Sequence, residues 1–308
     1  MSKIAVIGSG NVGATTAMFC AQKELGDVVL VDIVDGLPQG KALDQWETAS
    51  VERFDSYVQG SNDYSLVKGS DVVIVAAGMP RKPGMDRLDL LKTNAATVAG
   101  VTREVAAQAP GAILIMVTNP LDVMTYLAWK VSGFHHSRVM GQAGVMDSAR
   151  FKSFIAMELN VSVLDIQTIV LGGHGDNMVP LVRYTTVAGI PLTELMDQQR
   201  IDALVKRTRM AGGEIVGLLK TASAFYSPSA STAVMAEAIL RDRKRIMPCS
   251  CYLSGQYGLE DLYIGVPAKL GRGGVEDIYE LELTEPEKKA LHTSAAVYQK
   301  HIRTAIQE

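Results

Sequence analysis

Residues 4–13, IAVIGSGNVG, join a short aliphatic run to a glycine-rich turn. A helical pattern follows at about 12–25, and a second apolar run at 28–32 ends in Asp32. A strand, a Gly-x-Gly-x-x-Gly turn, a helix and a second strand with a terminal acid are typical of a dinucleotide-binding βαβ unit. This unit sets the fold class that we predict for the N-terminal half of the chain.

The glycines and the acid of this unit each have an expected task. Gly8 suits the tight turn, Gly10 lets a pyrophosphate approach the backbone, and Gly13 allows the helix to pack closely on the sheet. Asp32 can accept hydrogen bonds from both ribose hydroxyls and would repel a 2′-phosphate, so NAD is favoured over NADP. The alternative for Asp32 is a solvated acid at a strand end. The expected cofactor contacts here are Gly8, Ser9, Gly10, Asn11, Val12, Gly13 and Asp32.

Strand and helix patterns alternate through the first half of the chain. Strands are expected at 4–7, 28–32, 72–76 and 113–117, more weakly at 57–59 and 138–140, and helices near 12–25, 40–51, 88–108 and 121–131. The strand runs are apolar without alternation, as in a parallel sheet covered on both faces. Repeated strand–helix units with right-handed crossovers predict a doubly wound parallel sheet.

The second half has a different pattern. Helices are expected from near 146 and at 193–220, 229–242 and 284–305, with strands at 166–171, 247–253 and 262–266. No repeat or Pro/Ser-rich linker separates the halves. We therefore predict an α/β protein: a Rossmann-type doubly wound domain over residues 1–145, and an α+β substrate or catalytic domain over 146–308 that packs against it as one body.

Composition narrows the class of protein. Of 308 residues, 47% are hydrophobic and 20% are charged, and this composition is ordinary for a folded soluble chain. The formal net charge of −3 indicates neither nucleic acid nor an anionic membrane as a partner. No signal peptide and no run of the roughly 18–20 apolar residues of a membrane span is evident. Three cysteines cannot form a disulfide framework, and Cys249 and Cys251 are expected to be buried on one strand face, with no metal site. A cytoplasmic location is expected.

A hydride transfer to a 2-keto acid needs a proton donor, a cation for the substrate carboxylate and a group that polarises the carbonyl. His174, in the sequence Gly-Gly-His-Gly-Asp after an apolar run, is the candidate proton donor. The flanking glycines are expected to leave room for a ligand. A structural or solvated histidine is the alternative, and the other four histidines have surface-like contexts.

Asp147 and Arg150 are three residues apart at the start of a helix, so they point the same way. In the functional interpretation Arg150 holds the substrate carboxylate through a planar, two-pronged contact. Asp147 would orient His174 and stabilise its cation. The alternative is an ion pair on the helix surface.

Residues 79–87, MPRKPGMDR, follow the run at 72–76. Ligands of doubly wound sheets bind beyond the carboxyl ends of the strands, so this segment is expected to be a lid that carries Arg81 and Arg87. An exposed basic loop is the alternative. Asn119 ends the next strand and could bond both nicotinamide ribose and substrate, although a turn residue before proline is equally consistent.

These motifs occur in the order GSGNVG at 8–13, Asp32, RKPGMDR at 81–87, TNP at 118–120, DSAR at 147–150 and GHGD at 173–176. In this order the chain resembles the lactate/malate dehydrogenase family along nearly its whole length. The nearest resemblance is to the bacterial lactate-dehydrogenase-like malate dehydrogenases. The resemblance implies NAD as cofactor, a small 2-hydroxy acid as substrate and a homotetramer, or else a dimer, as the assembly.

The resemblance also implies roles for single residues. His174 would accept the proton in alcohol oxidation with Asp147 as its partner, and Arg87 would polarise the substrate oxygen. Arg150 would hold the carboxylate beside the reacting carbon. Further implied contacts are Asn94, Val117, Thr118 and Asn119 for the cofactor, and Asn119 and, less specifically, Ser223 for the substrate.

Arg81 decides the expected substrate. At the matching lid position of this family, an arginine resembles a malate enzyme and a glutamine a lactate enzyme. Oxaloacetate has a second carboxylate that can pair with Arg81, whereas pyruvate would leave a desolvated guanidinium unpaired. The alternatives are an L-lactate dehydrogenase, another 2-hydroxy acid dehydrogenase and a non-catalytic NAD-binding sensor. The last is disfavoured because His174, Asp147 and Arg150 are all present.

Overall fold

The computed structural model describes the backbone of residues 2–79 and 87–306 and the side chains of residues 2–79 and 91–305. Its centre is a sheet of nine strands in the order β14-β13-β12-β6-β5-β4-β1-β2-β3. Six of them come from the N-terminal half: β1 (Lys3–Ile7), β2 (Asp27–Val31), β3 (Val58–Ser61), β4 (Val72–Val75), β5 (Ile113–Met116) and β6 (Val139–Gly141). All six run parallel, in the strand order of a dinucleotide-binding fold, so the predicted doubly wound sheet is confirmed.

The same sheet continues into the C-terminal half. Three antiparallel strands extend it: β12 (Arg245–Ser254), β13 (Glu260–Gly271) and β14 (Gly274–Ile278). β12 joins β6 through the pair Ser250 and Gly141. The two halves of the chain therefore share one sheet across the expected boundary near residue 145.

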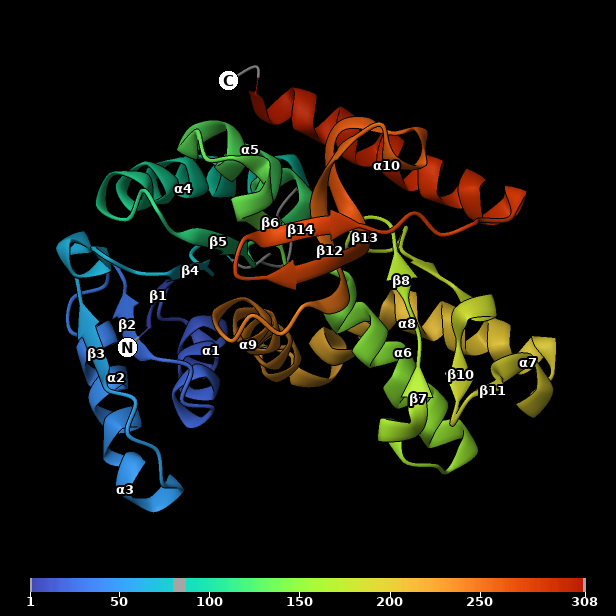
Figure 1. Ribbon diagram of the computed structural model, residues 1–308, viewed down its shortest axis with the longest axis horizontal. Helices are drawn as coiled ribbons and strands as arrows, with labels where there is room; N and C mark the ends of the chain where they lie inside the picture. Colours follow the sequence, from blue (N-terminus) through green and yellow to red (C-terminus); the bar gives the residue numbers. More distant parts are fainter. Residues whose placement is uncertain (1, 80–86, 307–308) are drawn as a thin grey trace.

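Helices cover both faces of the sheet (Figure 1). One layer holds α1 (Asn11–Gln22), α2 (Leu37–Glu47), α3 (Ala49–Glu52) and α9 (Tyr226–Leu240), and the other holds α4 (Arg87–Gln108), α5 (Leu121–Ser132) and α10 (Glu285–Ile306). α9 comes from the C-terminal half but packs on α1, where the Ser229 hydroxyl donates to the Val12 carbonyl at 2.8 Å. The helix layer of the N-terminal half is thus completed by a helix from the other half.

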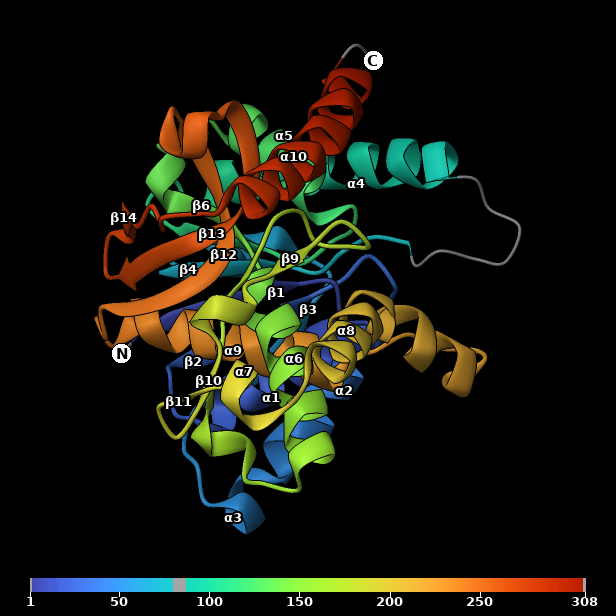
Figure 2. The same cartoon turned by 90° about the vertical axis from the view of Figure 1, so that its right-hand side faces the viewer.

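The remaining elements form a lobe with its own small core. It contains α6 (Gly144–Leu159), α7 (Leu192–Leu195), α8 (Gln198–Leu219), β7 (Ile166–Gln167), β8 (Val170–Leu171), β9 (Val179–Pro180), β10 (Thr186–Val187) and β11 (Ile190–Pro191). The short 3-10 helices of the chain are η1 (Tyr64–Val67), η2 (His136–Arg138), η3 (Val163–Asp165), η4 (Val182–Tyr184) and η5 (Gln256–Gly258). Figure 2 shows the start of α4 and the end of α8 projecting from the same side of the molecule.

Apolar burial follows the predicted strands. Every residue of β4 is fully buried, and Ile4 to Ile7 of β1 are at most 1% exposed. The main core spans both halves, from Ile4 to Ile302, while the lobe has a separate cluster under α6 and α8. In the described part of the chain, no helix has both the length and the apolar character needed to cross a membrane.

Three expected elements were wrong in extent. The strand expected at 166–171 is two short strands, because β7 pairs with β10 whereas β8 pairs with β9. The helix expected at 193–220 is divided into α7 and α8, since Asp197 caps a new helix by accepting the Arg200 N–H at 2.9 Å. The helix expected at 40–51 divides at Thr48 into α2 and α3. The spacing of hydrophobic residues does not show where a strand changes its pairing partner or where one helix ends and the next begins.

The close approach of α1 to the first turn predicts a stability defect. A Cβ at Gly13 would lie 1.7 Å from the Gly8 carbonyl oxygen, so backbone would have to move. Gly13→Ala should lower the free energy of unfolding by roughly 3 kcal/mol. Gly10→Ala is the matched control, because a Cβ there meets nothing within 4 Å. Urea denaturation of both variants checks this, and equal stabilities would contradict the close packing.

Candidate active site

The glycine turn and Asp32 lie together at one end of the candidate site. The Ser9 N–H donates to Asp32 Oδ2 at 2.6 Å, and the Val34 N–H donates to Oδ1 at 3.0 Å. The Asp32 carboxylate is therefore fixed beside the turn that precedes α1. Space remains open next to Gly10, where a Cβ would meet no atom within 4 Å. An open backbone turn at a helix N-terminus, with an acid at the end of the next strand, fits a dinucleotide.

Asn94 ties together the ends of two central strands. Its side chain is 1% exposed, accepts the Met79 N–H at 2.8 Å, and donates to the Asn119 carbonyl at 2.7 Å and to the Met79 carbonyl at 3.2 Å. Thr118 is also buried, and its hydroxyl donates to the Ala77 carbonyl at 2.7 Å. These two side chains shape the backbone beyond β4 and β5. Asn119 is exposed there, and Val117 is half-buried.

His174, Asp147 and Arg150 come together as the sequence predicts. His174 Nδ1 lies 2.9 Å from Asp147 Oδ2, and Arg150 Nη1 lies 3.4 Å from Asp147 Oδ1. The three side chains are only 13%, 2% and 11% exposed, respectively. The alternative of an ion pair on the helix surface is therefore wrong for Asp147 and Arg150, which α6 directs into the protein.

Opposing effects act on the pKa of His174. Burial lowers it, the Asp147 carboxylate raises it by charge and by hydrogen bonding, Arg150 lowers it and Asp122 raises it. The balance leaves the pKa above its usual value, so the protonated imidazole is favoured beside Asp147. With Nδ1 engaged by Asp147, Nε2 is the ring nitrogen left for a proton transfer.

The Arg150 guanidinium has hydrogen-bond donors that remain available to a ligand. Its guanidinium makes one long contact with Asp147, and its Nε is buried without a hydrogen-bond partner among the described residues. Burial lowers the pKa of Arg150 while Asp147 opposes this, and a guanidinium remains charged throughout the ordinary pH range. A buried cation with unsatisfied planar donors fits a carboxylate ligand.

Sequence analysis missed the residues that hold the His174 backbone. The His174 N–H donates to Asp122 Oδ2 at 2.8 Å, and the Tyr298 hydroxyl donates to the His174 carbonyl at 2.9 Å. Asp122 is fully buried and also accepts the Ser250 hydroxyl at 2.6 Å. An acid inside the apolar run of residues 121–124 was the available signal, because a buried carboxyl group needs partners.

The interpretation of the glycines next to His174 needs a correction. A Cβ at Gly173 would lie 1.8 Å from Tyr298 Cε2, and one at Gly172 would lie 3.2 Å from Ser294 Oγ. At Gly173 the missing side chain makes room for α10, and the expectation of ligand space there is wrong. The close approach brings Tyr298 within hydrogen-bonding distance of His174.

For three expected site residues, the described part of the structure gives no contact with His174. Arg81 lies outside the described residues. Arg87 is the first residue of α4, and its side chain is also outside them. Ser223 is exposed on the connection between α8 and α9. The lid and its two arginines stay predictions.

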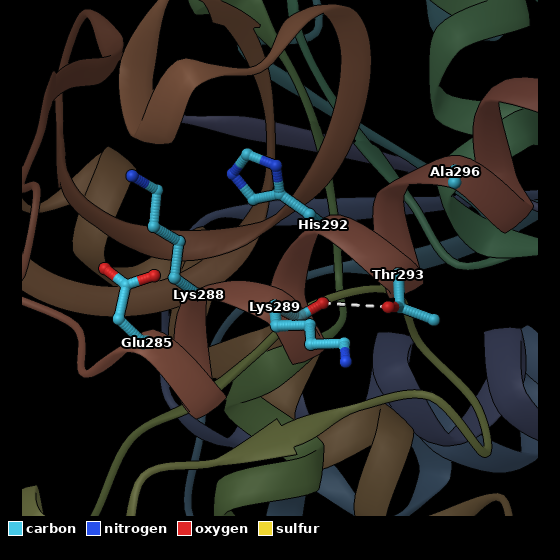
Figure 3. A pocket seen from close by; sticks show the side chains of 6 residues that line it. All are labelled: Glu285, Lys288, Lys289, His292, Thr293 and Ala296. Atoms are coloured by element: carbon cyan, nitrogen blue, oxygen red, sulfur yellow. Dashed lines mark hydrogen bonds between the residues drawn. The ribbon is translucent and has the colours of Figure 1, made fainter.

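A surface hollow on α10 offers a different candidate site (Figure 3). It is lined by Glu285, Lys288, Lys289, His292, Thr293 and Ala296, all from one helix. The Thr293 hydroxyl is bonded to the Lys289 carbonyl at 2.8 Å, and His292 Nε2 lies 2.9 Å from the Tyr257 carbonyl oxygen. Two of the polar side chains that line this hollow are therefore engaged in hydrogen bonds within the protein. The buried His174 cluster is the stronger candidate. Among the described residues, no group of three or more His, Cys, Asp or Glu side chains is arranged so that it could hold a metal ion.

Comparison with known proteins agrees with this geometry. A family model described as "lactate/malate dehydrogenase, NAD binding domain" matches residues 2–141. A second, "lactate/malate dehydrogenase, alpha/beta C-terminal domain", matches residues 145–308. Together the two models cover almost the whole chain.

Similar proteins share both sequence and structure. A malate dehydrogenase of Chloroherpeton thalassium is 60% identical over 294 residues, which is 95% of each chain. The solved malate dehydrogenase of Salinibacter ruber is 52% identical, with a TM-score of 0.95 over 99% of this chain and 97% of that one. A lactate dehydrogenase of Cryptosporidium parvum, solved with lactic acid and NAD, is 44% identical, with a TM-score of 0.96 over 100% of this chain and 98% of that one.

Proposed function

The chain belongs to the lactate/malate dehydrogenase family, and from this premise we propose that it interconverts malate and oxaloacetate with NAD as cofactor. One observation of the structure carries the proposal. The buried His174 imidazole is hydrogen-bonded to Asp147, and Arg150 has free donors beside the same carboxylate. This arrangement supports proton exchange next to a bound carboxylate group.

Each residue of the cluster has a part in the reaction. Arg150 binds the malate carboxylate beside the reacting carbon and fixes the orientation of the hydroxyl group. His174 takes the hydroxyl proton on Nε2, and Asp147 stabilises the resulting imidazolium. NAD supplies the acceptor for the hydride that leaves malate carbon 2. In the reverse direction the protonated His174 returns its proton to the oxygen of oxaloacetate.

The cofactor is assigned to the turn before α1 and to the ends of the central strands. Gly8 to Gly13 would hold the pyrophosphate, and Asp32 the adenosine ribose. Val117 and Asn119 would contact the nicotinamide end. The side-chain hydrogen bonds of Asn94 and Thr118 to backbone carbonyls support a role in shaping this end of the site.

The choice of oxaloacetate over pyruvate is assigned to Arg81, with Arg87 polarising the substrate oxygen and Ser223 at the edge of the pocket. Two features support malate as substrate: the 60% identity with the malate dehydrogenase of Chloroherpeton thalassium and the charge of Arg81 itself. Lactate dehydrogenase activity is the second candidate, because the Cryptosporidium lactate dehydrogenase has the same fold at 44% identity. The division into a cofactor half, 1–145, and a substrate half, 146–308, is part of the same proposal.

Loss of the proton acceptor tests the mechanism. His174→Asn should lower kcat for malate oxidation by about 100- to 10,000-fold, because the hydroxyl proton loses its acceptor. NADH binding, followed by fluorescence, should be retained. The control is His135→Asn, which changes an exposed histidine outside the cluster and should keep full activity. Undiminished turnover in His174→Asn would refute the mechanism.

Substitution of the lid arginine tests the substrate. The unchanged enzyme should oxidise NADH far faster with oxaloacetate than with pyruvate, followed at the NADH absorbance. Arg81→Gln should lower the preference for oxaloacetate by roughly 100-fold, since a carboxylate partner is lost and an unpaired cation is removed. Lys82→Gln removes a charge from the neighbouring residue and should keep the preference. If Arg81→Gln behaves like Lys82→Gln, the assignment of Arg81 is wrong.

Homo-oligomerisation, as a tetramer or else a dimer, is the proposed assembly. Large apolar side chains are exposed on several helices and loops, and clustered exposed apolar surface is typical of subunit contacts. The most exposed of the described side chains is Ile33, which follows β2, and after it come Leu164 of η3, Val51 of α3, Leu218 of α8 and Met157 of α6. Trp46 does not add to this surface, because it packs on the core and meets Tyr57 edge to face.

The particle mass in solution decides the assembly. Light scattering should give four times the mass of one chain for a tetramer and twice that mass for a dimer. Replacing Val51 and Leu164 with lysine should lower the mass, whereas the exposed polar change Glu47→Lys should leave it unchanged. A single-chain mass at micromolar concentration would refute the proposed assembly.

The proposed location is the cytoplasm, and the three free, buried cysteine thiols fit a reducing compartment.

A further inference from the structure

The His174 peptide is held from two sides by residues far away in the sequence. Its N–H donates to Asp122 Oδ2 of α5 at 2.8 Å, and its carbonyl accepts the Tyr298 hydroxyl of α10 at 2.9 Å. The imidazole is held independently, by Asp147 of α6 at 2.9 Å. Two carboxylates from different helices therefore flank one histidine, one at the ring and one at the peptide.

Asp122 is unusual as a purely structural hydrogen-bond acceptor. Its side chain is fully buried, and its two described partners are the Ser250 hydroxyl at 2.6 Å and the His174 N–H. Each of these bonds is neutral on the donor side. An asparagine could accept the His174 N–H on Oδ1 and donate from Nδ2 to the Ser250 hydroxyl oxygen, at a lower cost of burial than a charged carboxylate. The charge of Asp122 therefore calls for a function of its own.

We propose that Asp122 is a positioning residue that holds the His174 peptide and, through its charge, makes the imidazolium form of His174 more stable. This inference rests on the proposed role of His174 as proton acceptor. It gives two acids separate contacts with His174: Asp147 orients the ring and stabilises its cation most strongly, and Asp122 adds to the proton affinity from the peptide. Ser250 acts on His174 through Asp122, because its hydroxyl stabilises the charged carboxylate.

The charged groups around His174 agree with this assignment. Asp147 and Arg150 lie near it on α6, Asp122 on α5, and the Tyr298 hydroxyl on α10. The carboxylates of Asp147 and Asp122 raise the pKa of His174. Burial and the Arg150 guanidinium lower it. Burial raises the pKa of Asp122 to about 6, with Asp147 adding to this and Ser250 and His174 opposing it. Asp122 is thus ionised at neutral pH and able to act on His174.

The pH dependence of malate oxidation tests the proposal. Oxidation needs neutral His174, so kcat/KM should rise with pH through a midpoint set by the His174 pKa. Asp122→Asn keeps a hydrogen-bond acceptor for the His174 N–H but removes the charge, so this midpoint should move down by about half a pH unit to one unit. Oxaloacetate reduction needs protonated His174, and its decline with rising pH should begin at a correspondingly lower pH.

Two further variants separate charge from support. Tyr298→Phe removes the other hydrogen bond to the His174 peptide without changing a charge, so it should lower kcat and leave the midpoint in place. Ser250→Ala removes a donor to Asp122, which raises the pKa of Asp122, so the midpoint should move in the same direction as in Asp122→Asn but by less. Asp147→Asn is the positive control, since it removes the charge at the ring. Ser250→Ala decides the question if Asp122→Asn does not fold.

The outcomes are distinct. A lower midpoint in Asp122→Asn and Ser250→Ala, with none in Tyr298→Phe, supports the proposal. An unmoved midpoint in Asp122→Asn overturns it, and so does an equal shift in Tyr298→Phe, because that pattern belongs to a merely structural contact. His174→Asn distinguishes failure of the proposed function from failure of the role given to Asp122. If His174→Asn stays active, the proposed function itself fails. If His174→Asn is inactive and the midpoint of Asp122→Asn is unchanged, only the role of Asp122 is refuted.

Discussion

The junction of β6 and β12 is the contact on which the active site depends. There the backbone of Ser250 pairs with Gly141, and this pair joins the parallel and antiparallel parts of one sheet. The same Ser250 donates its hydroxyl to Asp122, which accepts the His174 N–H. A Cβ at Gly141 would lie 2.6 Å from Thr125 Oγ1 and 2.9 Å from Ser250 Cβ, so the junction has no room to spare. The position of His174 therefore depends on how the two halves meet.

Buried charge explains why this centre is built as a network. Asp147, Arg150 and Asp122 are largely or fully withdrawn from water, and an isolated charge in such a place would cost many kilocalories per mole. Each acid is therefore given donors: His174 and Arg150 for Asp147, and Ser250 with the His174 N–H for Asp122. Within the described part of this network, the Arg150 Nε is a buried donor without a hydrogen-bond partner. An unsatisfied cation in a satisfied network is the place where an anionic substrate gains most by binding.

Local patterns and long-range contacts differ in how far sequence predicts them. The six parallel strands and the Asp147–His174 pairing follow from periodicity and from the chemistry of the motifs, and both agree with the structure. Asp122 and Tyr298 lie 52 and 124 residues from His174 in the sequence, so only the folded chain shows that they meet it. Gly173 was misinterpreted for the same reason, since its neighbour Tyr298 arrives on the last helix.

The proposed function assigns proton transfer and substrate choice to different segments of the chain. The His174 network lies on buried helices and strands and is held from α5, α6, α10 and β12. Arg81 lies on the connection between β4 and α4, and connections tolerate substitution far better than buried networks do. In the proposed function, a change on that connection would alter which second substituent of the keto acid is accepted and would leave His174 and its charged neighbours unchanged. This separation is consistent with the similarity of this chain to both the malate dehydrogenase of Salinibacter ruber and the lactate dehydrogenase of Cryptosporidium parvum, with TM-scores of 0.95 and 0.96.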